Sequence, residues 1–388
     1  MNQEYDYIIA GAGAAGLSLA YKMLHPFFDD KRILVVDESL NPSHNKTWCF
    51  WDNKTPPFAD LMYRQWNNAE VSISGKRIKS PLNEYTYYCL RSIDFQEQIL
   101  RRLKKESRFD FLESTIEDLS VSYGIPILQT KSNSYQAEFI FQSCFSPWNS
   151  STDQPDYPLL QHFLGWEVKT TKPVFDDAFF TLMDFDDTFD EGIAFIYLLP
   201  WSKTSALIEY TIFSDELLSR EKYEEKISIY LNNRYNLKPI DYKITRTEFG
   251  EIPMKDRPHK PWYDTRILNI GTVGGVTKPS TGYTFSRIQK QTDQIIRDLQ
   301  TDEKPNAHSP SKTRFKAYDL WLLQIIHDHP SEAYHVFNQL FKNNSMDAIF
   351  SFLAEESAIT DDFKIMSSVP YTPFFRAIWQ TKERLLEI

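Results

Sequence analysis

The hydrophobic positions near the N-terminus form two short apolar runs with a helical pattern between them. Residues 7–10 and residues 33–36 are uninterrupted apolar runs, which is typical of buried strands. Residues 17–24 instead carry apolar side chains at helical spacing. The order strand, helix, strand predicts a βαβ unit of an α/β, Rossmann-like sheet.

The middle and the end of the chain have different patterns. Residues 266–270 are again a short buried run, followed by a glycine loop and a helical pattern. From residue 312 onward, apolar and aromatic positions recur at helical spacing and no β-rich run follows. Between these parts, four β-rich runs separated by turn residues predict an antiparallel sheet. They are residues 164–168, 178–183, 193–199 and 205–212.

A glycine motif of the form G-x-G-x-x-G joins the first predicted strand to the first predicted helix. Its glycines are Gly11, Gly13 and Gly16. The first permits a tight turn, the second lets a pyrophosphate approach the backbone, and the third permits close packing of helix against strand. The N–H groups of Ala14 and Ala15 would offer the partial positive charge of the helix N-terminus to phosphates. Asp37 lies where a carboxylate accepts hydrogen bonds from a ribose.

These features predict a nucleotide-binding domain, with an ordinary βαβ unit without a ligand as the alternative. By analogy with flavoproteins, the N-terminal position of the motif favours a resident FAD over an exchangeable NAD. We therefore expect a discontinuous FAD-binding domain, an inserted antiparallel-sheet substrate domain and a helical C-terminal region. Their expected limits are residues 1–150 with 250–305, residues 151–249, and residues 312–388.

Composition and charge exclude several classes of function. With 41% apolar residues in 388, the chain can build a sizeable core. A net charge of −10 argues against nucleic acid binding, which needs a basic face. Three cysteines without a C-x-x-C pair predict neither a disulfide framework nor a metal site, and a reducing cytosol fits. We expect no signal peptide and, without a run of about 18 apolar residues, no membrane-spanning helix. Association with a membrane surface stays open.

Aromatic side chains are concentrated just after the first βαβ unit. Trp48, Phe50 and Trp51 lie there, and Trp201 lies in a predicted hairpin of the middle sheet. Such side chains either pack into the core or form a wall beside a ligand, and both interpretations stay open. Arg91 precedes a predicted helix and either touches a cofactor phosphate or forms a surface salt bridge.

Separated motifs carry a resemblance to a known family. They are TWCFW at residues 47–51, FIYLLPWSKTSALIEYT at residues 195–211, GEIPM at residues 250–254 and NIGTVGGVTKPSTGYTF at residues 269–285. Together they resemble the lycopene cyclase family, carotenoid-making flavoproteins of the soluble bacterial type related to plant β- and ε-cyclases. The resemblance spans residues 5–287 and is weak in the helical tail. Asn45-Lys46 replaces the family's Asp-Arg, and Gly271-Thr272 replaces the Gly-Asp of many flavoproteins.

The resemblance implies a lycopene beta-cyclase, an isomerase that makes no net redox change. The ψ end of lycopene, or of another carotenoid with an acyclic end, would be protonated. The neighbouring double bond would attack the carbocation, and a proton would leave as the β ring closes. Two closures would give β-carotene via γ-carotene. The family implies reduced FAD, kept reduced by NAD(P)H, with the flavin stabilising the cation or relaying the proton.

Two glutamates are the candidate acids. Protonating an alkene needs a strong acid in a dry site, and burial keeps a carboxyl group protonated because desolvation raises its pKa. Glu209 fits, since Leu207 and Ile208 precede it; the alternative is a glutamate on the solvent face of the sheet. The resemblance favours the acid, because the family's L-I-E segment aligns here. Glu251 would share a proton with Glu209, position the flavin or accept the final proton, or is an ordinary turn carboxylate.

The resemblance also implies contacts with the cofactor and the substrate. The helix after the second glycine loop would aim its N-terminus at the flavin pyrimidine ring, where its partial positive charge stabilises an anionic reduced flavin. The aromatic rings named above would face the carbocation, with core packing as the alternative. The cofactor residues implied in this second region are Gly271, Pro279, Ser280, Thr281, Gly282 and Tyr283.

Because lycopene is insoluble in water, we expect a cytoplasmic protein bound peripherally to the inner face of the cell membrane. Two other function classes stay open. A flavin monooxygenase or other flavin oxidoreductase on the same fold would consume NAD(P)H in proportion to product. A non-catalytic nucleotide-binding or lipid-carrying protein would purify without flavin. The sequence does not distinguish one from two ring closures, β from ε rings, or NADH from NADPH.

Overall fold

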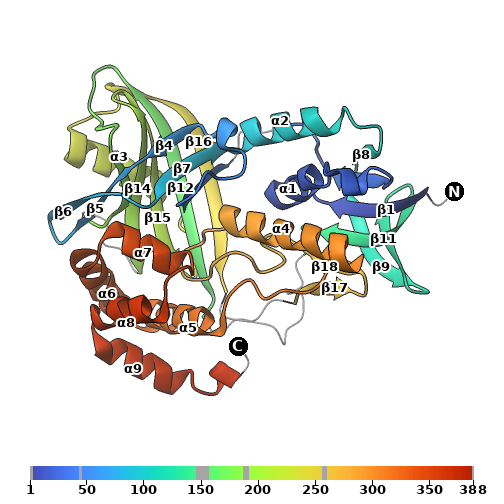
Figure 1. Ribbon diagram of the computed structural model, residues 1–388. Coiled ribbons are helices and arrows are strands. Elements are labelled where there is room, and N and C mark those ends of the chain that lie inside the picture. Colours follow the sequence, from blue (N-terminus) through green and yellow to red (C-terminus); the bar gives the residue numbers. More distant parts are fainter. Residues whose placement is uncertain (1–2, 43–45, 146–156, 187–191, 256–259, 387–388) are drawn as a thin grey trace.

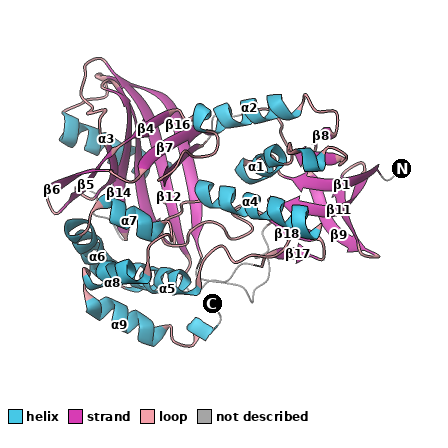
Figure 2. Ribbon diagram, viewed as in Figure 1, coloured by secondary structure: helices cyan, strands magenta, loops and turns pink. Residues whose placement is uncertain are grey.

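The computed structural model describes residues 3–42, 46–145, 157–186, 192–255 and 260–386 (Figure 1). Two large sheets lie at opposite sides of the molecule, and a group of C-terminal helices lies beside the second sheet (Figure 2). Asn45 and the expected domain junction between residues 150 and 151 lie outside the described residues.

The first sheet is built on the predicted βαβ unit, in the order β17-β18-β11-β1-β2-β8. In addition, β10 pairs with β11, and β9 pairs with β10. Strand β1 pairs in parallel with both β2 and β11. Its side chains alternate, so that Tyr7 and Ile9 pack with the helices while Ile8 and Ala10 pack with β9 and β10. The elements are β1 (Gln3–Ala10), β2 (Ile33–Asp37), β8 (Phe109–Glu113), β9 (Ile116–Ser122), β10 (Ile125–Thr130), β11 (Ser134–Gln142), β17 (Trp262–Asp264), β18 (Ile267–Asn269), α1 (Ala14–Lys22), α2 (Ser92–Leu103) and α4 (Phe285–Asp302).

Strand β18 and helix α4 come after the second sheet in the chain, but they lie with the first sheet and its helices. Strand β18 pairs in parallel with β11, and α4 packs against α1. The parallel centre of this sheet and the helices that cover it confirm the predicted α/β, Rossmann-like fold class. The domain limits themselves stay a prediction.

The second sheet has the order β16-β12-β15-β14-β13-β5-β6. Its pairs are antiparallel except for β13 with β5. Helix α3 (Arg220–Tyr235) packs on one face through Tyr223 and Ile227, against Ile196 and Ile208. The strands are β5 (Asn68–Ile73), β6 (Lys76–Pro81), β12 (Leu159–Thr170), β13 (Phe180–Asp184), β14 (Ile193–Ser202), β15 (Ser205–Ser214) and β16 (Tyr242–Met254).

Two features of this sheet differ from the sequence expectation. Strands β5 and β6 come from the N-terminal part of the chain. The sequence of such six-residue segments does not indicate which sheet they join. The GEIPM segment ends the long strand β16, so Glu251 is a strand residue rather than a turn residue.

A small sheet and the C-terminal helices complete the molecule. The small sheet contains β3 (Thr47–Asp52), β4 (Arg64–Trp66) and β7 (Thr86–Arg91). The C-terminal helices are α5 (Thr313–Asp328), α6 (Pro330–Asn343), α7 (Met346–Leu353), α8 (Ile359–Ser367) and α9 (Tyr371–Gln380). Trp51 and Tyr87 of the small sheet, Leu207 of β15, and Phe337 and Phe350 of the helices share one hydrophobic core. No helix in the described part of the chain is long and apolar enough to cross a membrane.

Candidate active site

A cavity of about 830 Å³ connects the first sheet, the second sheet and the C-terminal helices. Gly13, Ala14 and Ala15 line it beside the glycine motif, and Glu209 lines it on β15. Further lining residues come from the C-terminal helical region and are apolar: Phe337, Leu340, Phe341, Ile349, Phe352, Leu353, Ile365, Met366, Val369 and Phe374. The cavity therefore joins a nucleotide-type turn to a long apolar space.

The first glycine motif leaves room where a pyrophosphate would approach. A Cβ at Gly13 would have no heavy atom of the described residues within 4 Å, so the space beside it is open. Gly16 is packed instead, since a Cβ there would lie 1.9 Å from the Gly11 carbonyl oxygen. Gly11 has a φ of +106°, which favours glycine. Among the described residues, no side chain caps the N-terminus of α1, and Ala14 and Ala15 of its first turn line the cavity.

Asp37 supports this turn from behind. Its Oδ2 accepts a hydrogen bond of 2.5 Å from the Ala12 N–H, and its Oδ1 accepts one of 3.1 Å from the Ser39 N–H. The carboxylate therefore fixes the glycine turn at the end of β2. It does not belong to the cavity lining.

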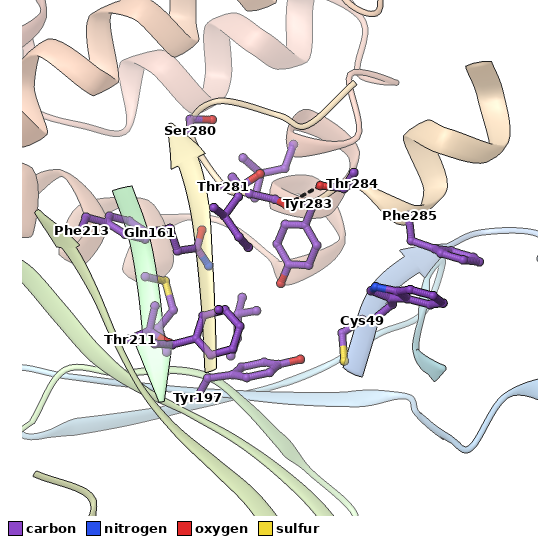
Figure 3. A pocket seen from close by; sticks show the side chains of 18 of the residues that line it. Cys49, Gln161, Tyr197, Thr211, Phe213, Ser280, Thr281, Tyr283, Thr284 and Phe285 are labelled. Atoms are coloured by element: carbon purple, nitrogen blue, oxygen red, sulfur yellow. Dashed lines mark hydrogen bonds between the residues drawn. The ribbon is translucent and has the colours of Figure 1, made fainter. Parts of the chain in front are cut away.

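The second glycine region lines the cavity opposite the first. Gly271 has a φ of +64°, and a Cβ there would lie 2.8 Å from the Ala15 Cβ, so the two glycine loops touch. Ser280, Thr281, Gly282 and Tyr283 line the cavity just before α4, as Figure 3 shows for three of them. Pro279 belongs to the same loop but not to the lining.

Two orphan polar atoms point to a ligand in this part of the cavity. Within the described residues, Thr281 Oγ1 and Gln161 Oε1 are buried without a hydrogen-bond partner, and both residues line the cavity. Buried polar groups without partners are rare in native proteins, so a bound group with donors and acceptors fits here. With the open glycine turn and the free helix N-terminus, the residues present fit a dinucleotide such as FAD.

A buried ion network holds this loop. Lys278 Nζ lies 2.9 Å from Asp319 Oδ1 of α5 and 3.1 Å from Glu355 Oε1, which follows α7. Ser280 Oγ donates a hydrogen bond of 2.6 Å to Asp319 Oδ1. The C-terminal helices are therefore tied directly to the loop beside the expected cofactor.

The aromatic residues singled out from the sequence divide into two groups. Trp48 lines the cavity and stacks on Phe285 with a centroid distance of 5.6 Å. The other three, Phe50, Trp51 and Trp201, pack in the core; Trp51 stacks on Phe350 at 4.4 Å and donates from Nε1 to its carbonyl. Arg91 forms an ion pair of 2.6 Å with Asp94 and does not line the cavity.

Glu209 lies buried in the cavity wall beside a second buried glutamate. Only 6% of Glu209 and 5% of Glu248 is exposed. The two are two strands apart: Glu209 of β15 is opposite Gly165 of β12, and Gly165 is opposite Glu248 of β16. Burial, the Glu248 charge and a hydrogen bond to Glu248 raise the pKa of Glu209 well above its usual value. The surroundings of Glu209 therefore favour its protonated form.

Glu248 is anchored by groups that Glu209 does not touch. It forms an ion pair with Arg246, which also binds Glu167 at 3.1 Å. Thr47 Oγ1 donates a hydrogen bond of 2.8 Å to Glu248 Oε2. Sequence reasoning missed Glu248 because the segment before GEIPM was not recognised as a strand, whose alternation would have paired Glu248 rather than Glu251 with the Glu209 face.

Glu251 lies on the other side of β16. It is exposed, although it lines part of the cavity, and its cross-strand neighbour is His162. Because it is three residues from Glu248 in an extended strand, its side chain leaves the opposite face. The structure does not bring Glu251 together with Glu209.

Three tyrosines form a hydrogen-bonded cluster beside Glu209. Tyr87 Oη lies 2.7 Å from Tyr197 Oη and 2.9 Å from Tyr283 Oη. Burial raises the pKa of all three, so the phenols stay neutral. Tyr197 and Tyr283 extend into the same space, with Cys49 beside them (Figure 3). Apart from Tyr283, no sequence motif singled out the members of this cluster.

Comparisons with known proteins agree with this geometry. Residues 6–379 match the family model described as "Lycopene cyclase protein". A lycopene beta-cyclase from Pantoea ananas is 25% identical over 398 residues, covering 97% of this chain and 98% of that protein. Two solved structures share the fold at low identity. A flavoprotein/dehydrogenase from Cytophaga hutchinsonii matches with a TM-score of 0.65 and 12% identity, over 98% of this chain and 100% of that chain.

The second is a geranylgeranyl bacteriochlorophyll reductase-like protein from Thermoplasma acidophilum, with a TM-score of 0.63 and 10% identity over 99% of this chain and 100% of that chain. The family match covers nearly all residues, including the C-terminal helices where the sequence motifs were weak. The predicted family is confirmed, and the chain belongs to the lycopene cyclase family.

Proposed function

We propose that the protein is a lycopene beta-cyclase, which closes the ψ ends of lycopene and of other acyclic-ended carotenoids into β rings. The observation that carries this proposal is the burial of Glu209 in the wall of a long apolar cavity, where desolvation raises its pKa. Water is a far better base than an alkene, so a carboxyl group can protonate carbon only where water is excluded. Family membership supplies the substrate class.

The proposed reaction is an isomerisation, so atoms and electrons balance within the substrate. Glu209 gives its proton to the terminal double bond of the ψ end, which leaves a tertiary carbocation and a carboxylate. The neighbouring double bond attacks that cation and forms the ring bond, which moves the positive charge into the ring. Loss of a proton from the adjacent ring carbon completes the β ring, and a base at the site takes that proton. Repetition at the second end gives β-carotene via γ-carotene.

The glycine motif and the second glycine region would hold FAD. Gly13, Ala14 and Ala15 would bind the pyrophosphate, with Gly11, Gly16 and Asp37 supporting the turn. Thr281 and Gln161, whose buried oxygens lack partners among the described residues, would meet the flavin ring. When bound and reduced, FAD would supply negative charge beside the carbocation, and NAD(P)H would keep it reduced.

We also propose that the protein works at the cytoplasmic face of the cell membrane. An apolar stripe on α8 and α9 supports this: Ile359, Phe363, Tyr371, Phe375 and Trp379 are exposed at four-residue spacing on each helix. Ile365, Met366 and Phe374 of the same two helices line the cavity. An exposed apolar patch over an apolar cavity fits a surface that rests on lipid and admits a hydrocarbon from it.

The direct test is expression in a bacterium that accumulates lycopene, followed by pigment analysis. A cyclase converts lycopene into β-carotene, with γ-carotene as the intermediate. Unchanged lycopene in cells that contain flavin-loaded protein would reject the proposal. An oxygenated or desaturated carotenoid would instead support a flavin oxidoreductase on the same fold.

A further inference from the structure

Gly165 is the reason that two carboxyl groups can meet in this sheet. Strands two positions apart in a sheet are separated by about 9.5 Å, and a side chain on the strand between them normally fills that space. A Cβ on Gly165 would lie 2.8 Å from Glu209 Cγ and 3.2 Å from Glu209 Oε1. Any other residue would therefore displace the Glu209 side chain.

The resulting contact has a defined direction. Glu248 is fixed on its far side by the Arg246 ion pair and by the hydrogen bond from Thr47. A carboxylate held in this way is an acceptor, so the protonated Glu209 is the donor in the hydrogen bond between them. Arg246 is itself held by Glu167 at 3.1 Å.

We infer that Glu248 is a positioning residue for the Glu209 acid: its anchored carboxylate holds the Glu209 proton in place across Gly165. This inference rests on the proposed function. The pair shares one proton in the resting state. After Glu209 has protonated the alkene, two carboxylates lie side by side in a buried site, and their repulsion favours recovery of a proton as the ring closes.

The other groups facing Glu209 do not provide this charge. Tyr197 of β14 and Tyr283 before α4 are phenols kept neutral by burial, and Cys49 of β3 contributes a thiol. Lys46 also lines the cavity but is exposed. Glu248 and, to a smaller extent, Cys49 therefore raise the pKa of Glu209, and Arg246 lowers it.

The opposite signs of these two charges define the experiment. Flavin-loaded full-length protein is assayed on lycopene in vesicles across a pH series, for the wild type, Glu248→Gln and Arg246→Gln. Glu209 acts in its protonated form, so activity is lost as the pH rises through its pKa. Glu248→Gln lowers that pKa, and the alkaline limb should move down by about one to three pH units. Arg246→Gln raises it, and the limb should move up.

Controls separate this role from a structural one. Glu117→Gln replaces an exposed glutamate on β9 and should leave the limb unmoved. In Glu248→Asp the alkaline limb should lie closer to that of the wild type than in Glu248→Gln, because aspartate keeps the negative charge. A lower rate at every pH with an unmoved limb in both Glu248→Gln and Arg246→Gln would overturn the inference. If the wild type forms no cyclised product at any pH, the proposed function fails instead.

Discussion

Glu209 owes its chemistry to the residues around it and not to its own position in the sequence. A glutamate in an antiparallel strand usually faces solvent, and the alternation of β15 alone does not decide which face is wet. The structure shows that both faces of this strand are covered, by α3 on one side and by the cavity and C-terminal helices on the other. A carboxyl group there has no water to stabilise its charge.

The central residue prediction is that Glu209→Gln abolishes cyclisation. Glutamine keeps the shape and some hydrogen bonding but cannot deliver a proton, so lycopene should stay unconverted. The cyclisation rate should fall by about 100-fold or more, as expected for removal of a general acid. Carotenoids extracted from lycopene-producing cells give the readout, and bound flavin is measured in parallel. Glu209→Asp should keep a trace of activity if its shorter arm still reaches. Near-normal β-carotene from Glu209→Gln would remove this residue from the mechanism.

A second residue prediction concerns Gly13. This position has an ordinary backbone conformation with a φ of −78°, and a Cβ there meets no heavy atom within 4 Å. Gly13→Val should therefore fold normally while its side chain fills the space expected for the pyrophosphate. The purified variant should be colourless, with an unchanged far-ultraviolet circular dichroism spectrum. Retained flavin absorbance would show that the nucleotide binds elsewhere.

Sequence patterns can single out a residue where the motif is local. The glycines around Gly13 are contiguous, and the L-I-E segment carries Glu209. Such patterns could not find Glu248, because the partnership of Glu248 with Glu209 depends on the register of three strands and on a glycine between them. Glu251 attracted attention through its motif, but strand alternation puts it on the opposite face from Glu209.

At the scale of elements, the C-terminal helices do two different things. Their inward faces extend the apolar cavity and, through Asp319, bind the loop beside the expected flavin site. Their outward face carries the apolar stripe, of which Phe375 and Trp379 are 70% and 72% exposed. Lys382 lies 4.4 Å above the Trp379 ring, which puts a cation beside the stripe, as at a lipid headgroup boundary.

The element prediction is that this stripe mediates lipid binding. Phe375→Ser with Trp379→Ser should weaken flotation with phospholipid vesicles at least several-fold, because each ring loses about 1.5–3 kcal/mol of apolar burial in the lipid. Tyr123→Ser is the matched control, since it removes a fully exposed ring from the distant β9–β10 turn. Equal flotation of the double variant and the wild type would assign the stripe another role, such as contact between copies.

The helices and strands themselves were easier to predict from the sequence than the strands and helices with which they pack. The βαβ unit, the antiparallel runs and the helical tail are local patterns, and the structure contains all of them. Strands β5 and β6 were missed as members of the second sheet, because six-residue runs carry no information on which sheet they join. The shared core of the small sheet, the second sheet and the C-terminal helices likewise arises from contacts between segments far apart in the chain.

At the scale of the whole molecule, one cavity brings together three parts that have separate sequence patterns. The first sheet contributes a nucleotide turn, the second sheet contributes a buried acid, and the C-terminal helices contribute an apolar space under an apolar surface. This arrangement suits a reaction in which a hydrocarbon enters from lipid and meets a proton beside a cofactor. The same fold in a flavin oxidoreductase would instead couple each product to oxidation of NAD(P)H.

Turnover in D₂O distinguishes these two outcomes most directly. Purified, flavin-loaded protein is incubated with lycopene vesicles and limiting NADH, and the product is analysed by mass spectrometry while NADH consumption is followed. Because the Glu209 proton exchanges with solvent, an acid-initiated cyclase should place one deuterium in each ring formed and should close many rings per NADH consumed. Product without deuterium, or NADH consumed in proportion to product, would contradict the proposed cyclase.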